Sequence, residues 1–172
     1  MAAAGLLILR LVVGGILAAH GAQKLFGWWG GPGMTNWTGA MARMRLRPPT
    51  AWAWISAVGE FAGGLALALG LLYPLPSIAI AAAMLFAIAL VHLPKGFWNS
   101  KGGFEFNLSL LGAAAALALA GPGAVSLDAA LKIRFPEPVT LIGLTILLVL
   151  GVGAALLTRT PAPVTEPKPQ AT

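Results

Sequence analysis

The stretch VHLPKGFWNSKGGFEFN, residues 91–107, shows how this chain is organised, because it joins two long apolar runs at residues 75–93 and 106–120. Histidine, lysine, glutamate, asparagine and aromatic residues are gathered in it. A plain connector between two helices does not need that chemistry. Helices that end at the same membrane face bring such polar groups together, and loops positioned by a rigid scaffold often carry function. The stretch therefore predicts a helical hairpin with a polar site at its turn.

The composition is that of a membrane protein. Hydrophobic residues make up 58% of the 172 residues and charged residues only 9%, against roughly 45–50% and 25% in soluble domains. About 20 apolar residues span a bilayer as a helix, and such runs lie at residues 4–25, 51–72, 75–93, 106–120 and 139–157. Because lipid requires every backbone hydrogen bond to be closed internally, all five are expected to be helical.

We therefore predict an all-α integral membrane fold, a four-helix transmembrane bundle with a fifth C-terminal transmembrane helix. Residues 1–130 form the four-helix membrane domain, 131–157 a connector and the fifth helix, and 158–172 a disordered Pro-rich tail. The first run is interpreted as a retained helix and not a cleaved signal peptide, because its only early charge, Arg10, lies inside the apolar run.

Two short helices are expected in the joints between spans. Thr35 is placed to cap one that runs to about Arg45, and Pro48 and Pro49 stop it. Ser126 is placed to cap the other, which precedes the fifth span.

The basic residues indicate the orientation in the membrane. We call the membrane face at the N-terminus the X face and the opposite one the Y face. Eight of the 11 Lys and Arg residues fall at Y: Lys24, Arg43, Arg45, Arg47, Lys95, Lys101, Arg159 and Lys168. Cytoplasmic loops carry the excess of basic residues. We expect a multi-pass protein of the cell (inner) membrane with the N-terminus outside and the C-terminus in the cytoplasm. The net charge of +6 then reflects topology and contact with membrane lipids, and indicates no nucleic acid.

Tryptophan is also concentrated at the Y face. All six lie there: Trp28, Trp29, Trp37, Trp52, Trp54 and Trp98. They form either an aromatic belt in the headgroups or part of a pocket for a flat, apolar ligand. The chain has no cysteine, which excludes a thiolate nucleophile and an iron–sulfur cluster held by its own thiols.

Ionisable side chains lie within the spans, where they are costly and usually face a partner or a cavity. His20, Glu60, His92 and Glu105 are all predicted to lie in the leaflet on the Y side. Glu60 is the deepest of them. Its expected partner is Arg10 or His20, and the pair is either structural or a site of proton exchange.

Four segments resemble the DoxX family: LRLVVGGILAAHGAQKLFG from Leu9, GEFAGGLALALG from Gly59, the hairpin stretch above, and GPGAVSLD from Gly121. The likeness covers about residues 5–130. It implies a four-helix membrane protein related to the small membrane subunit of thiosulfate:quinone oxidoreductase. Members are tied to redox, quinone-stress and thiol-stress systems, often as partners of soluble enzymes. The fifth span and the tail extend beyond the family core.

The positions that match the family pattern are His20, Gln23, Lys24, Glu60, His92, Lys95, Glu105, Asn107 and Asp128. We predict a catalytic set, His20, Glu60, His92 and Glu105. A substrate-binding set is predicted at Gln23, Lys24, Lys95, Trp98 and Asn107. No metal site is predicted.

Three functions are compatible with the sequence. The first is a membrane redox subunit with a quinone as cofactor, in which His20 and Glu60 bond a quinone carbonyl or relay its protons. The second is a non-catalytic anchor that recruits a soluble or membrane redox partner protein through the Y-face loops. A haem or metal site using His20 and His92 is the third and weakest. A homo-oligomer is open, because the small-residue faces at Gly14 and Gly59 can seal the monomer or join copies.

Overall fold

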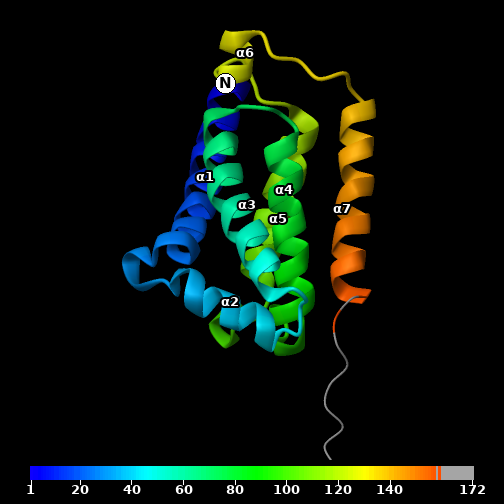
Figure 1. The fold of residues 1–172 in the computed structure, drawn as a ribbon. Coiled ribbons are helices and arrows are strands. Elements are labelled where there is room, and N and C mark those ends of the chain that lie inside the picture. Colours follow the sequence, from blue (N-terminus) through cyan, green and yellow to red (C-terminus); the bar gives the residue numbers. More distant parts are fainter. Residues whose placement is uncertain (158, 160–172) are drawn as a thin grey trace, which may run out of the picture.

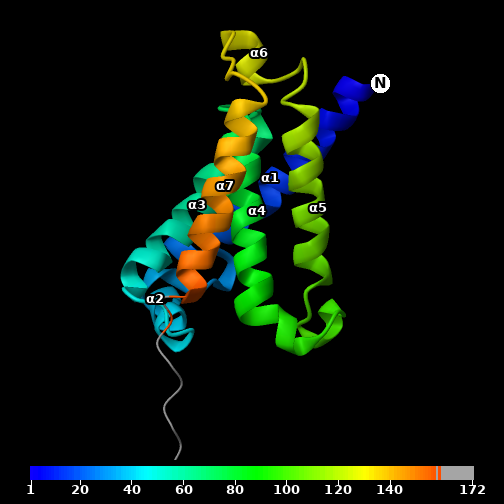
Figure 2. The ribbon, with the colours of Figure 1, turned by 90° about the vertical axis from the view of Figure 1, so that its right-hand side faces the viewer.

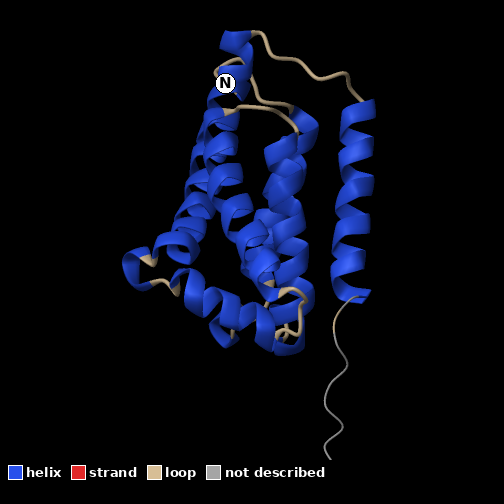
Figure 3. Cartoon of the chain, in the orientation of Figure 1, coloured by secondary structure: helices blue, strands red, loops and turns tan. Residues whose placement is uncertain are grey.

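The computed structural model of the chain describes residues 1–157 and 159; the expected disordered tail at 158–172 lies, except for Arg159, outside the described residues. The described part is built from helices and loops, with no strand (Figure 3). The prediction of an all-helical membrane fold is confirmed.

The five predicted spans are all present as helices. They are α1 (Ala2–Phe26), α3 (Pro49–Leu69), α4 (Leu75–Ala87), α5 (Glu105–Ala120) and α7 (Val139–Leu157). A π-helical turn at Ile88–His92 and a 3-10 turn at Leu93–Lys95 prolong α4 into a largely apolar helical segment of 21 residues. By length and composition α1, α3, the prolonged α4 and α7 can cross a membrane, while α5 is shorter at 16 residues.

Two short helices lie at opposite ends of the bundle. α2 (Gly33–Arg43) crosses the Y end, and α6 (Leu127–Leu131) lies at the X end, the end of the bundle at which the chain begins (Figure 1). Thr35 was the wrong cap for α2, because the helix begins earlier, after Pro32, with no side-chain cap. Ser126 is the cap of α6, as predicted, and its Oγ accepts a hydrogen bond of 3.2 Å from the Ala129 amide.

Glycine lets α1 and α3 pack with their backbones in contact. A Cβ atom added at Gly14 would lie 2.5 Å from the Gly64 carbonyl oxygen, and one at Gly21 only 2.3 Å from the Phe61 nitrogen. Gly14 also faces Ala68. The small-residue face at Gly14 therefore seals the monomer, as small residues do when transmembrane helices approach closely.

The second small-residue face does not seal helices together. A Cβ atom at Gly59 would meet nothing within 4 Å, and one at Gly63 would only touch the Ala79 methyl group at 3.9 Å. Gly59 borders open space that belongs to a pocket.

Figure 2 shows that α5 and α7 lie on different sides of α4.

The glycine contacts also fix the register of the two helices. Because Gly21 lies against Phe61 in an antiparallel pair, the end of α1 at Phe26 is level with residue 56. α3 begins at Pro49, so at roughly 1.5 Å per residue it extends about 10 Å farther toward Y than α1 does. The helix α2 crosses the bundle at this step (Figure 1).

A buried carboxylate links two connectors at the X end of the bundle. Asp128, 3% exposed, accepts hydrogen bonds from the Leu72 amide at 2.9 Å and the Tyr73 amide at 2.8 Å. Both amides belong to the connector between α3 and α4. Burial raises the pKa of Tyr73 to about 12, so this phenol stays neutral.

Arg10 also belongs to the X end. Its guanidinium is buried and donates hydrogen bonds to the carbonyl oxygens of Pro122 and Val125. Arg10 was therefore wrong as a candidate partner for Glu60. Helical side chains lean toward the N-terminus of their own helix, and for α1 that direction is the X face.

We predict that Gly14→Ala destabilises the protein and that Gly15→Ala does not. The methyl group at residue 14 would push α3 away, an overpacking cost of about 1–3 kcal/mol. A Cβ atom at Gly15 meets nothing within 4 Å, so this neighbour on the same helix is a matched control. Thermal unfolding in detergent measures both. Equal midpoints for the two variants would contradict the close contact.

Candidate functional site

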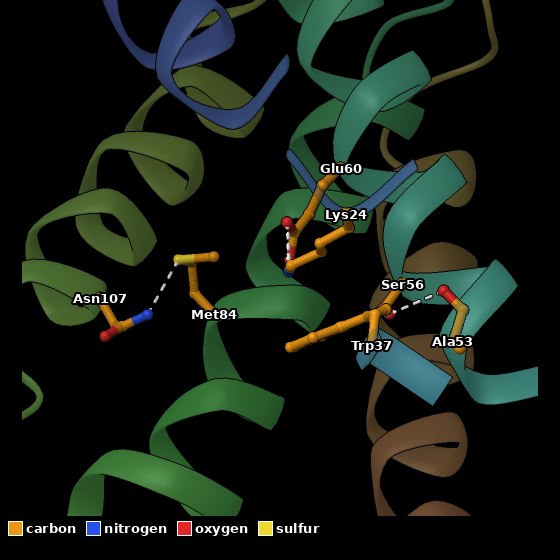
Figure 4. Close-up of polar contacts among 7 residues, drawn as sticks. All are labelled: Lys24, Trp37, Ala53, Ser56, Glu60, Met84 and Asn107. Carbon is orange, nitrogen blue, oxygen red and sulfur yellow. Dashed lines mark hydrogen bonds and ion pairs between the residues drawn. The ribbon is translucent and has the colours of Figure 1, made fainter. Parts of the chain in front are cut away.

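The centre of the candidate site is an ion pair between α1 and α3. The Nζ atom of Lys24 donates to both carboxylate oxygens of Glu60 (Figure 4). The two side chains are 15% and 8% exposed. They meet because the helices are antiparallel: Lys24 leans toward X and Glu60 toward Y, each toward the N-terminus of its own helix. The sequence-based expectation that His20 or Arg10 pairs with Glu60 was wrong.

The stagger of the two helices explains why the sequence did not reveal this partner. Depths counted from helix ends assume that both helices end at one level, which places Lys24 near the interface and Glu60 about 14 Å below it. With Gly21 against Phe61, Lys24 is instead level with residue 58. The pattern of close-packing glycines on the two helices was the signal that could have given this register.

Trp37 of α2 covers the ion pair. The Lys24 Nζ atom lies 4.3 Å from the centroid of the Trp37 ring, a cation–π distance. The indole Nε1 donates to Ser56 Oγ at 2.8 Å, and that hydroxyl donates to the Ala53 carbonyl oxygen at 3.1 Å (Figure 4). This chain of bonds anchors Trp37 to α3, so the ring has a fixed position over the ammonium group.

On one side of the pair lies a cavity of about 310 Å³ between α2, α3, α4 and α7, here called the apolar pocket. Its wall is almost wholly hydrocarbon, and its polar groups are Lys24, Ser56, Glu60 and the tryptophan rings. The rings of Trp52 and Phe86 stack in it with centroids 5.8 Å apart and an interplanar angle of 19°. This geometry suits a flat apolar group.

On the other side lies a cavity of about 530 Å³, here called the polar cavity. Its polar lining consists of His20, Lys24, Trp37, Arg43, Glu60, His92, Asn99 and Asn107. Among the residues that the structure describes, Glu60 is the only carboxylate in this lining, and it is already paired. The cavity therefore presents mostly hydrogen-bond donors and positive charge.

The ion pair belongs to the walls of both cavities. Lys24, Glu60 and Trp37 line the apolar pocket and the polar cavity alike. A ligand in the apolar pocket can thus hydrogen-bond to side chains that also face the polar cavity. The same side chains can carry a proton from one cavity to the other. This arrangement is what a proton-coupled reaction of an apolar ligand requires.

His92 has a defined hydrogen-bonding state in the polar cavity. Its Nδ1 atom lies 2.7 Å from the Gly102 carbonyl oxygen. A carbonyl only accepts, so Nδ1 carries the hydrogen, and in the neutral ring Nε2 is left as an acceptor. His92 ends the π-helical turn Ile88–His92, a distortion that often marks functional sites.

A model of the DoxX family matches residues 5–93. The chain belongs to the DoxX family. The matched part contains α1 to α4, and with them Lys24, Glu60, His20 and His92. No curated protein and no solved structure matches the chain. It is a multi-pass membrane protein, as the family and its apolar helices together show.

Two more of the predicted residues of this DoxX protein line the polar cavity. Asn107 is buried, and its Nδ2 atom donates to the Met84 sulfur at 3.6 Å (Figure 4). His20 lies near Phe106, with ring centroids 6.4 Å apart. Neither contact uses the polar atoms fully, so both side chains keep hydrogen-bonding capacity toward the cavity.

Four predicted residues line neither cavity: Gln23, Lys95, Trp98 and Glu105. Lys95 and Trp98 are exposed on the hairpin at the Y face. Glu105 stands in the first turn of α5, where the helix dipole favours a carboxylate. Gln23 packs against Gly31, whose added Cβ would lie 2.4 Å from the Gln23 Cβ. A direct role for these four stays a prediction.

The sequence did not predict three contributors to the two cavities. Arg43 was assigned to topology and to the Y-face loops that recruit a partner and was absent from the predicted site residues, but it lines the polar cavity. Phe86 and residues of α7 line the apolar pocket. In a membrane span, an aliphatic or aromatic residue that lines a pocket cannot be told from one that faces lipid by sequence alone.

The geometry gives little support to the hypothesis of a haem or metal site at His20 and His92. His20 and His92 do line the same cavity. Within the described residues, however, no group of three or more His, Asp and Glu side chains is placed to hold a metal ion.

We predict that Lys24→Met and Glu60→Gln each destabilise the protein more than the double variant does. Each single change leaves a buried polar group without its partner, at a cost of about 3–5 kcal/mol for a buried charge. The double variant removes both charges, leaving a neutral amide at residue 60, and should recover much of the loss. A double-mutant cycle on thermal unfolding in detergent tests this. Strictly additive effects would mean that the two side chains do not interact.

Proposed function

We propose that this DoxX protein is the membrane subunit of a quinone-linked redox system, with the quinone ring in the apolar pocket. The observation that carries the proposal is the position of the Lys24–Glu60 pair in the walls of both cavities. The pair offers a ligand in the apolar pocket an ammonium donor and a carboxylate at the same place. The polar cavity then provides a route for protons away from that ligand.

The lining of the apolar pocket fits a quinone. A quinone ring is flat and apolar with two carbonyl oxygens, and stacked Trp52 and Phe86 offer a flat aromatic wall. The Lys24 ammonium supplies the donor for a carbonyl oxygen. At about 310 Å³ the pocket is at the lower end of the usual range for small ligands, which suits a single ring with part of a tail.

Each polar residue has a definite part in the proposal. A bound quinone supplies two-electron, two-proton chemistry. Lys24 orients the ring by donating to a carbonyl oxygen, while the Glu60 carboxylate holds or releases a proton beside it. His92 Nε2, an acceptor in the polar cavity, passes protons between Glu60 and the Y face, with His20 near the same route. This is general acid–base catalysis by positioned side chains.

The electrons have to come from outside the chain, because it has no cysteine for a thiol relay. The donor-rich polar cavity, with Arg43 in its wall, suits an anionic reductant of the thiosulfate or thiolate type, or the redox centre of a partner protein. Positive clefts concentrate anionic substrates.

We also propose that the Y face is cytoplasmic, because it carries most of the basic residues. The cysteine-free chain permits single-cysteine labelling. Lys132→Cys at the X end should react with an impermeant maleimide added to whole cells, whereas Lys101→Cys at the Y end should react only after the cells are opened. The reverse pattern would overturn the orientation.

A second candidate function is a non-catalytic anchor for a redox enzyme. It is favoured by Trp28 and Trp29, which are 52% and 70% exposed in the turn between α1 and α2. In that case the Lys24–Glu60 pair serves packing alone, and a soluble partner binds the Y-face loops.

We predict that Glu60→Gln lowers quinone-linked turnover in membranes by about 10²–10⁴-fold, the usual contribution of a general acid–base group. Its control is Glu137→Gln, an exposed carboxylate at the X end, which should keep full turnover. Size-exclusion chromatography checks that both variants are folded. Unchanged turnover of a folded Glu60→Gln variant, with the partner still bound, would favour the anchor.

A further inference from the structure

The fifth helix, α7, is fastened to the bundle at its Y end. Ala155 is fully buried and belongs to an apolar cluster with Met41, Leu46 and Ala53. Two residues beyond the end of the helix, the Nε atom of Arg159 donates a hydrogen bond of 3.0 Å to the Met44 carbonyl oxygen. α7 is thus attached to α2 and to the start of α3 near the membrane surface.

Farther toward the X face, α7 packs against α4, with Leu148 against the main apolar core, and a space lined by α3, α4 and α7 remains beside this contact. The α7 residues Leu147, Leu148, Gly151 and Val152 line the apolar pocket. The opposite wall is made of the small residues Gly59, Ala79, Ala82 and Ala83. A Cβ atom added at Gly151 or at Gly59 would meet nothing within 4 Å. The pocket is therefore a groove bordered by α3, α4 and α7, with open space at both glycines.

The pocket is polar at one end only. Lys24, Ser56 and Glu60 lie on the side toward α1 and α2, and the α7 side is hydrocarbon alone. A ligand that uses the ion pair must therefore place an apolar part against α7. Most of α7 is exposed outward, and lipid covers such a surface in a membrane, so the gap leads from the ion pair toward the bilayer.

We infer that α7 forms one wall of a channel for a long hydrocarbon tail, and that Gly151 sets the width of this channel. The inference rests on the proposed function and deepens it: the ligand is a quinone with an unbranched or isoprenoid tail, and the fifth helix selects for the tail. The tail leaves the ring at Lys24 and lies in the groove bordered by α3, α4 and α7, over the small residues of α4.

Shape is the basis of this selection. A tail in the bilayer is already in hydrocarbon, so moving it into the channel gains contacts and not a transfer from water. A side chain at residue 151 has open space to enter, so Gly151→Leu leaves the bundle intact and occupies the tail's place. Gly153 lies on the same helix, its added Cβ also meets nothing within 4 Å, and it does not line the pocket.

The test compares ligands with and without a tail on the full chain in lipid nanodiscs. The probes are a dimethoxy-methyl-benzoquinone without a tail, the same ring with a decyl tail, and a decyl alcohol carrying a diazirine for photolabelling. Quenching of tryptophan fluorescence gives the affinities of the two quinones. Gly151→Leu should weaken the tailed quinone by about tenfold or more, the usual effect of misfit in an apolar pocket. The tail-free quinone should bind within about twofold of wild type, and Gly153→Leu should change neither affinity.

The outcomes separate the channel from the proposed function. If Gly151→Leu weakens both quinones alike, or neither, the tail channel is wrong and the quinone site stands. If neither quinone binds wild type but the alcohol labels α7, and Gly151→Leu abolishes the label, the quinone function is wrong and the channel stands. If the tailed quinone binds while the alcohol never labels α7, the channel is again wrong. Absence of all binding and labelling overturns both.

Discussion

The backbone contact between α1 and α3 is the constraint on which the site depends. Gly14 and Gly21 of one helix and Gly64 of the other allow an approach that no side chain would permit. The contact fixes the antiparallel register and ends α1 short of α3. The resulting step brings Lys24 level with Glu60 and accommodates α2, whose Trp37 covers the pair. A change of register by one helical turn would move Lys24 about 5.4 Å along α3 and separate it from Glu60.

Stability alone does not require the ion pair. Removing two charges from water costs more than many buried pairs return, and apolar residues of similar volume often stabilise as well. Here the pair is bidentate, covered by an aromatic ring and set between an apolar and a donor-rich cavity. Ionisable groups kept within a membrane usually mark the route of a ligand or of protons.

Much of the fold could be predicted from the sequence, because apolar length and turn chemistry are local signals. The five spans and the Ser126 cap follow from them. The site was predicted less well. Lys24 was named, but its partnership with Glu60 depends on how far one helix slides along another, which no single span records. Gln23, Lys95, Trp98 and Glu105 were also predicted as site residues, but they line neither cavity. The Y-face tryptophans divide between a pocket lining, as for Trp37 and Trp52, and the exposed surface, as for Trp29.

The position of α7 shows a further limit of sequence reasoning. The unbroken apolar run at residues 139–157 predicts a span. Its sequence, however, does not indicate that this helix forms a wall of a pocket with α3 and α4. The structure gives that helix a place beside the proposed ligand, since Gly151 and Val152 share a pocket with Lys24 and Glu60. The family match ends at residue 93, so this wall is a feature of the chain outside the matched segment.

The most direct test of the account is whether the protein binds a quinone beside the ion pair. The full chain would be purified in mild detergent, incubated with excess decyl-tailed quinone and freed of unbound ligand. Its ultraviolet spectrum would then be recorded before and after chemical reduction. The account predicts a reducible quinone band at close to one quinone per chain, lost in the Lys24→Met variant. A featureless difference spectrum from the folded wild-type protein would contradict it.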